Sequence, residues 1–362
     1  MNKNLLEKGE ELELALRELY RSNGYRPYKM SKFEPYDLYA QNRSFVSGAH
    51  ILTFTDTNGQ LMALKPDVTL SIIKNYRGGQ QKTCYHENVY RDAGTSREFR
   101  EIPQAGLECI GEIDQFTQIE VLTLAAESLR RIAGEAILDI ASVQWVRGLL
   151  QISGVSADIE AELLKCVKEK NPHGMRAVCL AAGMEERLAE IWRRLALLYG
   201  PARQLIPQLE EMSLSDDMMA AARDMQWLCD FAAGQTGVQV NLDFSILQDL
   251  EYYNGLVFKG YVPGVHESIL SGGRYDHLVQ KLGKQAGAIG FAVYLDLLTQ
   301  LPADGTALDA DVLLLYGDGA SPDEILRHAE ALRGQGKTVR VQKTRDDGRY
   351  GEIQWVKGAT EL

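Results

Sequence analysis

Two polar side chains in one strand-like segment are placed to bind a ligand. Gln104 and Glu108 lie four residues apart, so the two-residue period of a strand puts both on the same face. A carboxylate and an amide side by side on the inner face of a sheet are costly unless something satisfies them. The pair therefore indicates either a binding pocket or a buried polar pair satisfied within the protein, and this segment alone favours neither.

A second strand-like segment, residues 85–91, precedes the one that contains Gln104 and Glu108. Arg91 is its last residue, and Arg97 lies in the polar loop that joins the two segments. Guanidinium groups bind carboxylates and phosphates through paired N–H donors. The strand–loop–strand unit is thus a candidate anion site.

Two further segments carry candidate groups, and each has a simpler interpretation. Asp67 and Thr69 flank a turn that Pro66 fixes, and they could bind an ammonium group, although such residues are more often a plain turn or a helix cap. The adjacent Tyr252 and Tyr253 could contact a ligand, but paired tyrosines on a strand are more commonly core and edge aromatics.

Glycines mark two more positions. Gly272 and Gly273 precede an expected helix, where they would let a ligand approach the backbone, although Gly-Gly is also a common turn. The run Gly317-Asp318-Gly319 lacks the third glycine of a phosphate-binding turn, so we predict no nucleotide there.

The elements that must position these groups alternate between helix and strand. Helical periodicity predicts amphipathic helices at residues 5–20, with Gly24 near the end, and 116–133. Short apolar stretches among Gly, Asn and Pro predict strands at residues 51–55, 84–90 and 108–110, with a tight hairpin turn at 56–59.

The middle of the chain, from about 145 to 233, is predicted to be a helical insertion between two sheet-forming halves. It is rich in Ala, Leu and Glu, with expected breaks at Gly154, Pro172, Gly183, Gly200-Pro201 and Pro207. Strands resume at 238–244 and 252–261, a helix follows Gly272-Gly273, and a strand and another helix surround residues 290–292.

The C-terminal part is predicted to be a separate small unit. We expect a core at residues 1–300, a linker at 301–308 and an α/β unit at 309–362. Within that unit the pattern predicts strands at 312–316, 337–341 and 353–356 and a helix at 322–333.

Composition limits the kind of protein. The 362 residues carry a net charge of −11, which disfavours binding to polyanions over most of the surface. No apolar run approaches the roughly 20 residues that cross a bilayer, and the N-terminus lacks the apolar segment of a signal peptide. The five cysteines have no paired spacing for zinc or disulfides, so we expect a protein of the reducing cytoplasm without metal or cofactor.

Taken in order, the four candidate segments resemble the core of class II aminoacyl-tRNA synthetases, in the histidyl-tRNA synthetase branch. The likeness covers roughly residues 20–145 and 238–300. Residues 64–69 correspond to that branch's amino-group loop, and residues 85–91 with 99–111 correspond to its motif 2. Residues 248–258 and 271–278 correspond to its first and second histidine signatures. The resemblance implies an α+β fold, an antiparallel sheet flanked by helices, and a dimer.

Site residues follow from the same resemblance. It implies that Asp67, Thr69 and Gln104 hold the amino group of histidine. Glu108 and Tyr253, with Tyr252 beside them, would contact the imidazole, and Arg91 would face the carboxylate. A carboxylate can accept an imidazole N–H, and a phenol can serve the other ring nitrogen.

This chain departs from active synthetases at the positions that supply positive charge. Arginines expected in the first histidine signature, after the double tyrosine and at the end of motif 3 are here Gln248, Gly255 and Leu297. Adenylation depends on donors placed where negative charge develops, and losing one typically costs roughly two to three orders of magnitude in rate. The C-terminal unit is also about half of the anticodon-binding domain that the resemblance implies.

The remaining pattern resembles the regulatory subunit of short-form ATP phosphoribosyltransferase. The likeness rests on residues 252–264 and 271–276 and on Asp67 in a Lys-Pro-Asp loop, although Lys65 departs from the more usual arginine. It implies a non-catalytic subunit that joins a separate catalytic chain in a hetero-octamer and relays feedback inhibition by L-histidine. It implies no tRNA partner. Feedback inhibition of this kind requires a coupling free energy of about 1–3 kcal/mol between the histidine site and the active site of the catalytic chain.

Two alternatives stay open from the residues. One is a divergent histidyl-tRNA synthetase that replaces the missing positive charge. The other is a stand-alone histidine-binding paralogue with a different partner. Pyrophosphate exchange into ATP and affinity for the catalytic chain distinguish the three.

Overall fold

The computed structural model describes residues 8–42, 51–92, 99–247, 250, 252–301 and 308–356. The chain forms two compact units, Met1–Leu301 and Pro302–Leu362, and each is described by itself.

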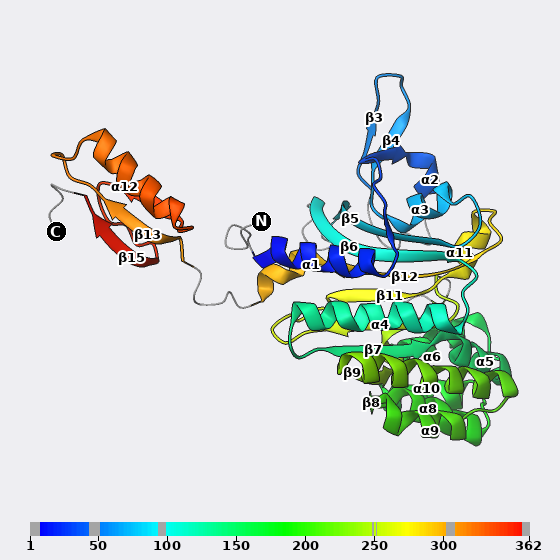
Figure 1. The fold of residues 1–362 in the computed structure, drawn as a ribbon. Coiled ribbons are helices and arrows are strands. Elements are labelled where there is room, and N and C mark those ends of the chain that lie inside the picture. Colours follow the sequence, from blue (N-terminus) through cyan, green and yellow to red (C-terminus); the bar gives the residue numbers. More distant parts are fainter. Residues whose placement is uncertain are drawn as a thin grey trace. The chain divides into compact units, whose positions relative to one another are not determined.

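A nine-stranded sheet forms the centre of the first unit (Figure 1). Its strands, in spatial order, are β1 (Arg26–Pro27), β5 (Gln81–Asp92), β6 (Phe99–Gly111), β12 (Gly287–Tyr294), β11 (Leu270–Arg274), β10 (Leu256–Tyr261), β7 (Ile137–Ser142), β9 (Gln239–Asp243) and β8 (Tyr199–Pro201). All neighbours are antiparallel except β1 with β5 and β7 with β9. The predicted α+β architecture with a largely antiparallel sheet is therefore confirmed.

The hairpin β5–β6 is longer than its sequence pattern predicts. Its register runs without interruption from Gln81 opposite Ile110 to Asp92 opposite Phe99. The pattern predicts strands at residues 84–90 and 108–110, with the second extended back to Gln104 by the placement of Gln104 and Glu108 on one face. Backbone pairing continues through the polar residues because each ladder bond needs only a partner strand.

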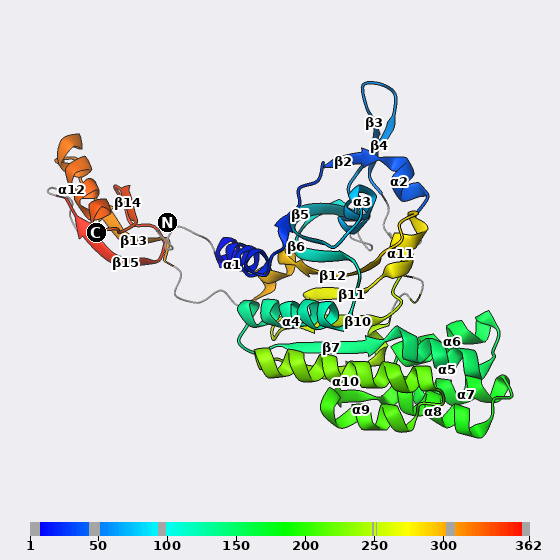
Figure 2. The same ribbon diagram turned by 45° about the vertical axis from the view of Figure 1, so that its right-hand side comes forward.

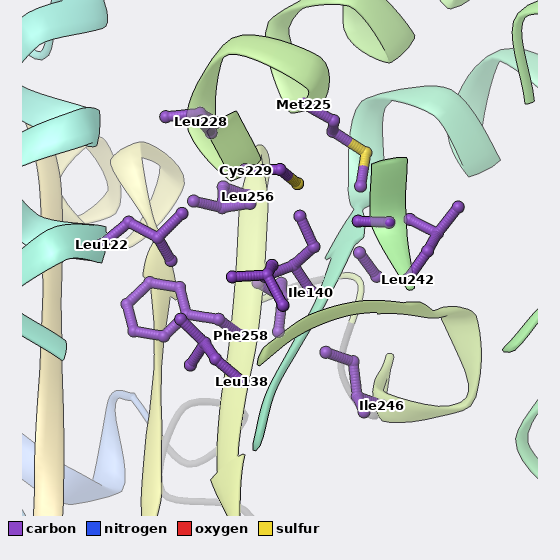
Figure 3. Close-up of a cluster of buried hydrophobic side chains, with 14 of the residues drawn as sticks. Leu122, Leu138, Ile140, Met225, Leu228, Cys229, Leu242, Ile246, Leu256 and Phe258 are labelled. Carbon is purple, nitrogen blue, oxygen red and sulfur yellow. The ribbon is translucent and has the colours of Figure 1, made fainter. Parts of the chain in front are cut away.

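Three helices cover one face of this sheet, α1 (Lys8–Ser22), α4 (Gln115–Ile132) and α10 (Asp216–Thr236). Figure 3 shows Leu138, Ile140 and Phe258 from the strands pointing into a cluster with Leu122 of α4 and Leu228 of α10. This packing buries the apolar stripe of each helix, which is the main source of stability for amphipathic helices.

The opposite face is covered by smaller elements and holds a second apolar cluster. The helices are α2 (Tyr36–Ala40), α3 (Thr69–Asn75) and α11 (Asp276–Lys281). A three-stranded sheet, β2 (Phe33–Pro35), β4 (Leu61–Leu64) and β3 (Thr53–Thr55), lies beside them. The predicted hairpin turn is confirmed, with the Asp56 carboxylate accepting the backbone N–H groups of Asn58 and Gln60 at 2.9 and 2.8 Å.

The predicted helical region comprises α5 (Val143–Ser153), α6 (Ala157–Lys168), α7 (Pro172–Ala181), α8 (Glu186–Leu197), α9 (Ala202–Glu211) and α10. Figure 2 shows α5 to α9 grouped next to α10, at the β7 side of the sheet. Two details differ from the prediction. The short strand β8 interrupts the helices and joins the sheet edge. Pro207 does not break α9, because burial of Ile206 and Leu209 outweighs the one missing hydrogen bond.

In the second unit the predicted elements are confirmed. Strand β13 (Ala310–Leu315) lies between β14 (Val339–Gln342) and β15 (Tyr350–Trp355), all parallel, with α12 (Pro322–Gly334) packed against them. Ser321 and Glu324 form a reciprocal capping box at the start of α12.

Among the described residues, no helix is long and apolar enough to span a membrane. That same part of the chain contains no group of three or more His, Cys, Asp or Glu side chains placed to hold a metal ion. All five cysteines are buried and free.

Candidate ligand-binding site

A cavity of about 210 Å³ lies on the face of the sheet that α1, α4 and α10 do not cover. The structure brings together in its lining all seven residues that the sequence indicated: Asp67, Thr69, Arg91, Gln104, Glu108, Tyr252 and Tyr253. Their shared location is an observation, whereas binding of histidine by them stays a prediction.

Small residues make part of the floor of the cavity. Ser271 and Ala292 lie side by side on β11 and β12 and line it, and next to them Gly106 of β6 makes room for the Tyr85 ring. A side chain at Gly290 would overlap the Glu108 carboxylate, so this carboxylate lies directly over the backbone of β12. Glycine at position 290 is therefore required for Glu108 to reach across the sheet.

Glu108 is the most buried charged group of the cavity, with 3% of its surface exposed. Thr69 donates its hydroxyl proton to one Glu108 oxygen at 2.7 Å, and the Tyr275 hydroxyl donates to the other. Burial raises the pKa of Glu108 to about 8, and these two hydrogen bonds oppose part of that rise. An N–H donor or a cation from a ligand would complete the site by stabilising the ionised carboxylate.

Asp67 fits both interpretations of its sequence position, a helix cap and a ligand for an ammonium group. Its carboxylate accepts the backbone N–H of Leu70 in the first turn of α3 at 2.8 Å, and it also lines the cavity. Burial raises the pKa of Asp67, whereas the Arg91 guanidinium, 3.9 Å away, lowers it. Asp67 is thus both a helix-terminus residue and a potential partner for an ammonium group.

The loop that carries Asp67 is fixed to β5 by a buried ion pair. Lys65 is 1% exposed, and its ammonium pairs with Glu87. The backbone N–H of Tyr90 donates to the Lys65 carbonyl at 2.9 Å. The lysine that departs from the expected arginine therefore has a structural role in positioning residues 64–69.

Arg91 lies at the end of β5 and is partly engaged by the protein. Its Nε donates to the Pro66 carbonyl at 2.7 Å, and one-third of its side chain is exposed. Arg91 also lines the cavity, and its guanidinium carries five N–H donors, of which the Nε donor is bonded to Pro66. Arg97, the other predicted anion ligand, lies outside the described residues.

The tyrosine pair and the glycine pair occupy different elements from those predicted. Tyr252 and Tyr253 precede β10 in a turn, because antiparallel pairing with β7 and β11 begins only at Leu256 and Val257. Gly272 and Gly273 lie inside β11 and form no turn, because both edges of that strand are paired, and the predicted helix follows as α11. Gly272 lines the cavity, and Gly273 allows close packing, since a Cβ there would lie 2.7 Å from the Tyr253 ring.

Several lining residues were not identified from the sequence, namely Tyr85, Lys259, Ser271, Tyr275 and Tyr294. Ser271 and Tyr275 belong to the second histidine signature, so that segment contained a usable signal for them. The local sequence around Lys259 did not indicate that its side chain lines the cavity. Its position there depends on the order of β6, β12, β11 and β10 in the sheet.

An adjoining cavity of about 300 Å³ contains one of the three departures from the synthetase pattern. Leu297 lines it with an uncharged side chain. Gly255 packs against Arg274, because a Cβ at position 255 would lie 2.9 Å from the Arg274 Cδ. The Nε of Arg274 pairs with the Asp276 carboxylate at 2.9 Å. Gln248 lies outside the described residues.

Sequence comparison agrees with this geometry. The family model for histidyl-tRNA synthetase matches residues 2–298. An ATP phosphoribosyltransferase regulatory subunit from Desulfitobacterium hafniense is 30% identical over 298 residues, 79% of this chain and 75% of that protein. The chain belongs to the family of ATP phosphoribosyltransferase regulatory subunits, within the wider histidyl-tRNA synthetase family. Another such regulatory subunit, from Ruminiclostridium cellulolyticum, is 28% identical over 346 residues and matches 91% of this chain and 81% of its own.

Solved structures of the regulatory subunit family share the fold. An ATP phosphoribosyltransferase regulatory subunit/histidyl-tRNA synthetase from Bacillus halodurans aligns with a TM-score of 0.77 at 23% identity, over 96% of this chain and 93% of that one. A chain of the ATP phosphoribosyl transferase complex from Thermotoga maritima aligns with a TM-score of 0.64 at 20% identity, over 80% and 97%. At these identities the likeness establishes the class II synthetase-like fold.

Proposed function

We propose that this chain is the non-catalytic regulatory subunit of an ATP phosphoribosyltransferase and that its cavity binds L-histidine as the feedback effector. In this role it joins a separate catalytic chain, which condenses ATP with phosphoribosyl pyrophosphate in the first step of histidine biosynthesis. Membership of the regulatory subunit family supports the role.

The observation that carries the ligand assignment is the distribution of polar groups in one cavity. Acceptors that suit an ammonium and an imidazole N–H, Asp67 and Glu108, lie with the cation Arg91, which suits a carboxylate. Histidine has all three of these groups. A ligand that lacks one of them would forgo the charge-assisted interaction with Asp67, Glu108 or Arg91, which costs binding free energy.

The positions that would support adenylation are not equipped for it. The adjoining cavity has Leu297 where active synthetases carry arginine, and Gly255 packs against Arg274. Two absent donors together are expected to lower an adenylation rate by roughly four orders of magnitude or more. We therefore propose a subunit without synthetase activity and without a tRNA partner, in which the second unit is a shortened counterpart of the anticodon-binding domain.

The proposed assembly has two kinds of contact. The core pairs with a second copy of itself, as the synthetase likeness implies, and the pairs join the catalytic chains in a hetero-octamer. The name of the Thermotoga maritima structure, an ATP phosphoribosyl transferase complex, supports a partnership of this kind.

Reconstitution with a short-form catalytic chain tests the proposal. We expect a stable complex, a higher rate of phosphoribosyl transfer, and inhibition by histidine that requires this chain. A complex that does not form, with no gain in rate, would show the proposed role to be wrong. In parallel, histidine-dependent exchange of pyrophosphate into ATP would identify a synthetase instead.

A further inference from the structure

We propose that Lys259 is the anchor for the carboxylate of the bound amino acid and so determines that the cavity selects a free amino acid over uncharged analogues. The inference rests on the proposed function and goes beyond it, because it gives the ligand carboxylate a second cation besides Arg91, on the opposite side of the cavity from Glu108.

Strand register places Lys259 on the floor side of the sheet. On β10 it is the direct partner of Ser271 on β11, which in turn faces Ala292 on β12 and then Gly106 on β6. Its neighbour Gly260 points the other way, since a Cβ there would lie 2.7 Å from Leu129 of α4. Only small side chains therefore stand between Lys259 and β6 along this row.

The spacing fits one amino acid. The Glu108 carboxylate lies over Gly290 on β12, two strands from β10. Adjacent strands are about 4.8 Å apart, and Lys259 lies two residues along β10 from the row that contains Gly290, so its backbone is roughly 12 Å from that carboxylate. A lysine side chain that extends part of this distance leaves room for a ligand with a cationic or N–H group at one end and an anion at the other.

Four residues line both the main cavity and the adjoining one: Arg91, Lys259, Ser271 and Tyr294. They define the boundary between the two cavities, and we refer to them as the donor seam. Two are cations and two carry hydroxyl groups, so all four can donate hydrogen bonds. A carboxylate accepts such bonds at both oxygens, which makes the seam chemically complementary to it.

Lys259 is the cation of the seam that lacks a partner. Arg91 already donates to Pro66 and faces Asp67. Within the described parts of the chain, the Lys259 ammonium makes no hydrogen bond and no ion pair within 4.0 Å, and the Asp139 carboxylate opposite it on β7 keeps one buried oxygen unbonded. Burial and the nearby Lys168 lower the pKa of Lys259, whereas Asp243 raises it. A carboxylate bound beside the ammonium would also raise this pKa and stabilise the charged form.

The test compares histidine with histidinol and histamine, which keep the imidazole and the amino group but lack the carboxylate. Isothermal calorimetry on the full chain measures each ligand with the native protein, Lys259→Met and Lys259→Arg. We expect Lys259→Met to weaken histidine binding roughly 10- to 100-fold, the effect of losing a charge-assisted hydrogen bond, and to leave histidinol and histamine almost unchanged. Lys259→Arg should restore most of the preference for histidine.

Two matched variants make the result specific. Lys168→Met removes a nearby, exposed charge that does not line the cavity, and we expect it to leave the preference intact. An equal loss in Lys168→Met would overturn the proposal in favour of a general electrostatic field. Arg91→Met distinguishes the two cations, and a preference that depends on Arg91 but survives in Lys259→Met would also overturn it.

Failure of this inference is distinguishable from failure of the proposed function. If the native chain binds histidine but Lys259→Met keeps the full preference over histidinol, only the role of Lys259 is wrong. If the native chain binds none of the three ligands, the proposed histidine site is wrong and Lys259 with it. Melting temperatures of all variants check that each is folded.

Discussion

The cavity and the helical region α5–α10 are built in opposite ways. In the helices, most boundaries depend on residues close in sequence. Asn171 and Ser215 accept backbone N–H groups at the starts of α7 and α10, and Gly154 and Gly237 adopt left-handed φ at the ends of α5 and α10. In the cavity, Glu108 depends on Thr69 and Tyr275, and Arg91 depends on Pro66, all of them far away in the chain.

Substitutions in the two regions therefore have different consequences. A cap residue contributes to the stability of one helix and leaves the site untouched. A floor residue of the cavity has little effect on local conformation but determines whether a distant carboxylate fits. The four predictions below test this contrast, from the largest expected effect to the smallest.

Replacement of Gly290 by alanine should have the largest effect on ligand binding. Its Cβ would overlap the Glu108 carboxylate, so Glu108 must move and its bonds to Thr69 and Tyr275 must break. We expect histidine affinity to fall by more than about 100-fold and the free energy of unfolding to fall by about 1–3 kcal/mol. Calorimetry and urea denaturation measure the two effects.

Gly134→Ala is the matched control for this substitution. No atom lies within 4 Å of a Cβ at Gly134, which is outside the cavity lining. Equal effects of the two alanines would contradict the role assigned to the floor.

Replacement of Glu108 by alanine should come next. The change removes the acceptor for the imidazole N–H and leaves the hydroxyl groups of Thr69 and Tyr275 without their partner. Loss of a charged acceptor corresponds to a roughly 10- to 100-fold weaker affinity for histidine. In the reconstituted enzyme the same variant should lose histidine inhibition. Unchanged inhibition would place the effector site elsewhere.

Glu108→Gln should separate stability from function through its pH dependence. In the folded chain the pKa of Glu108 is about 8, above its ordinary value of 4.5, so folding favours the protonated form. Ionisation of Glu108 therefore lowers the stability of the native chain as pH rises from about 4.5 to 8, and the glutamine variant lacks this contribution. Allowing for one lost hydrogen bond, we expect the variant to be more stable by roughly 1–3 kcal/mol at pH 8 and to have no such advantage at pH 4.5.

Urea denaturation at both pH values measures this difference. A gap between variant and native chain that does not change with pH would mean that Glu108 is ionised without penalty in the folded protein.

The smallest effect is expected in the helical region. Ser215→Ala removes a cap bond to the Met218 N–H and should lower the free energy of unfolding by about 1 kcal/mol, with no change in histidine affinity. Ser156→Ala is the control, because Ser156 precedes α6 but makes no side-chain cap bond. A change in ligand affinity in Ser215→Ala would show that the two regions are coupled.

Local patterns predicted most of the fold elements. The amphipathic helix near the N-terminus, the hairpin turn at Asp56, the breaks at Gly154 and Gly183 and the whole β13–α12–β14 unit follow from signals within a few residues. The exceptions, β8, Pro207 and the position of the two tyrosines, arise where packing or strand pairing overrides local preference.

Seven of the residues that line the cavity could be identified from the sequence, through the synthetase resemblance. The other lining residues depend on how the strands assemble. Lys259 and Ser271 lie across the cavity from Glu108 because of the order of the strands in the sheet. That strand order is set by contacts between segments that are distant in the chain. Burial of Glu108, and with it the raised pKa, likewise depends on the elements packed over β6, since desolvation is a property of the assembled fold.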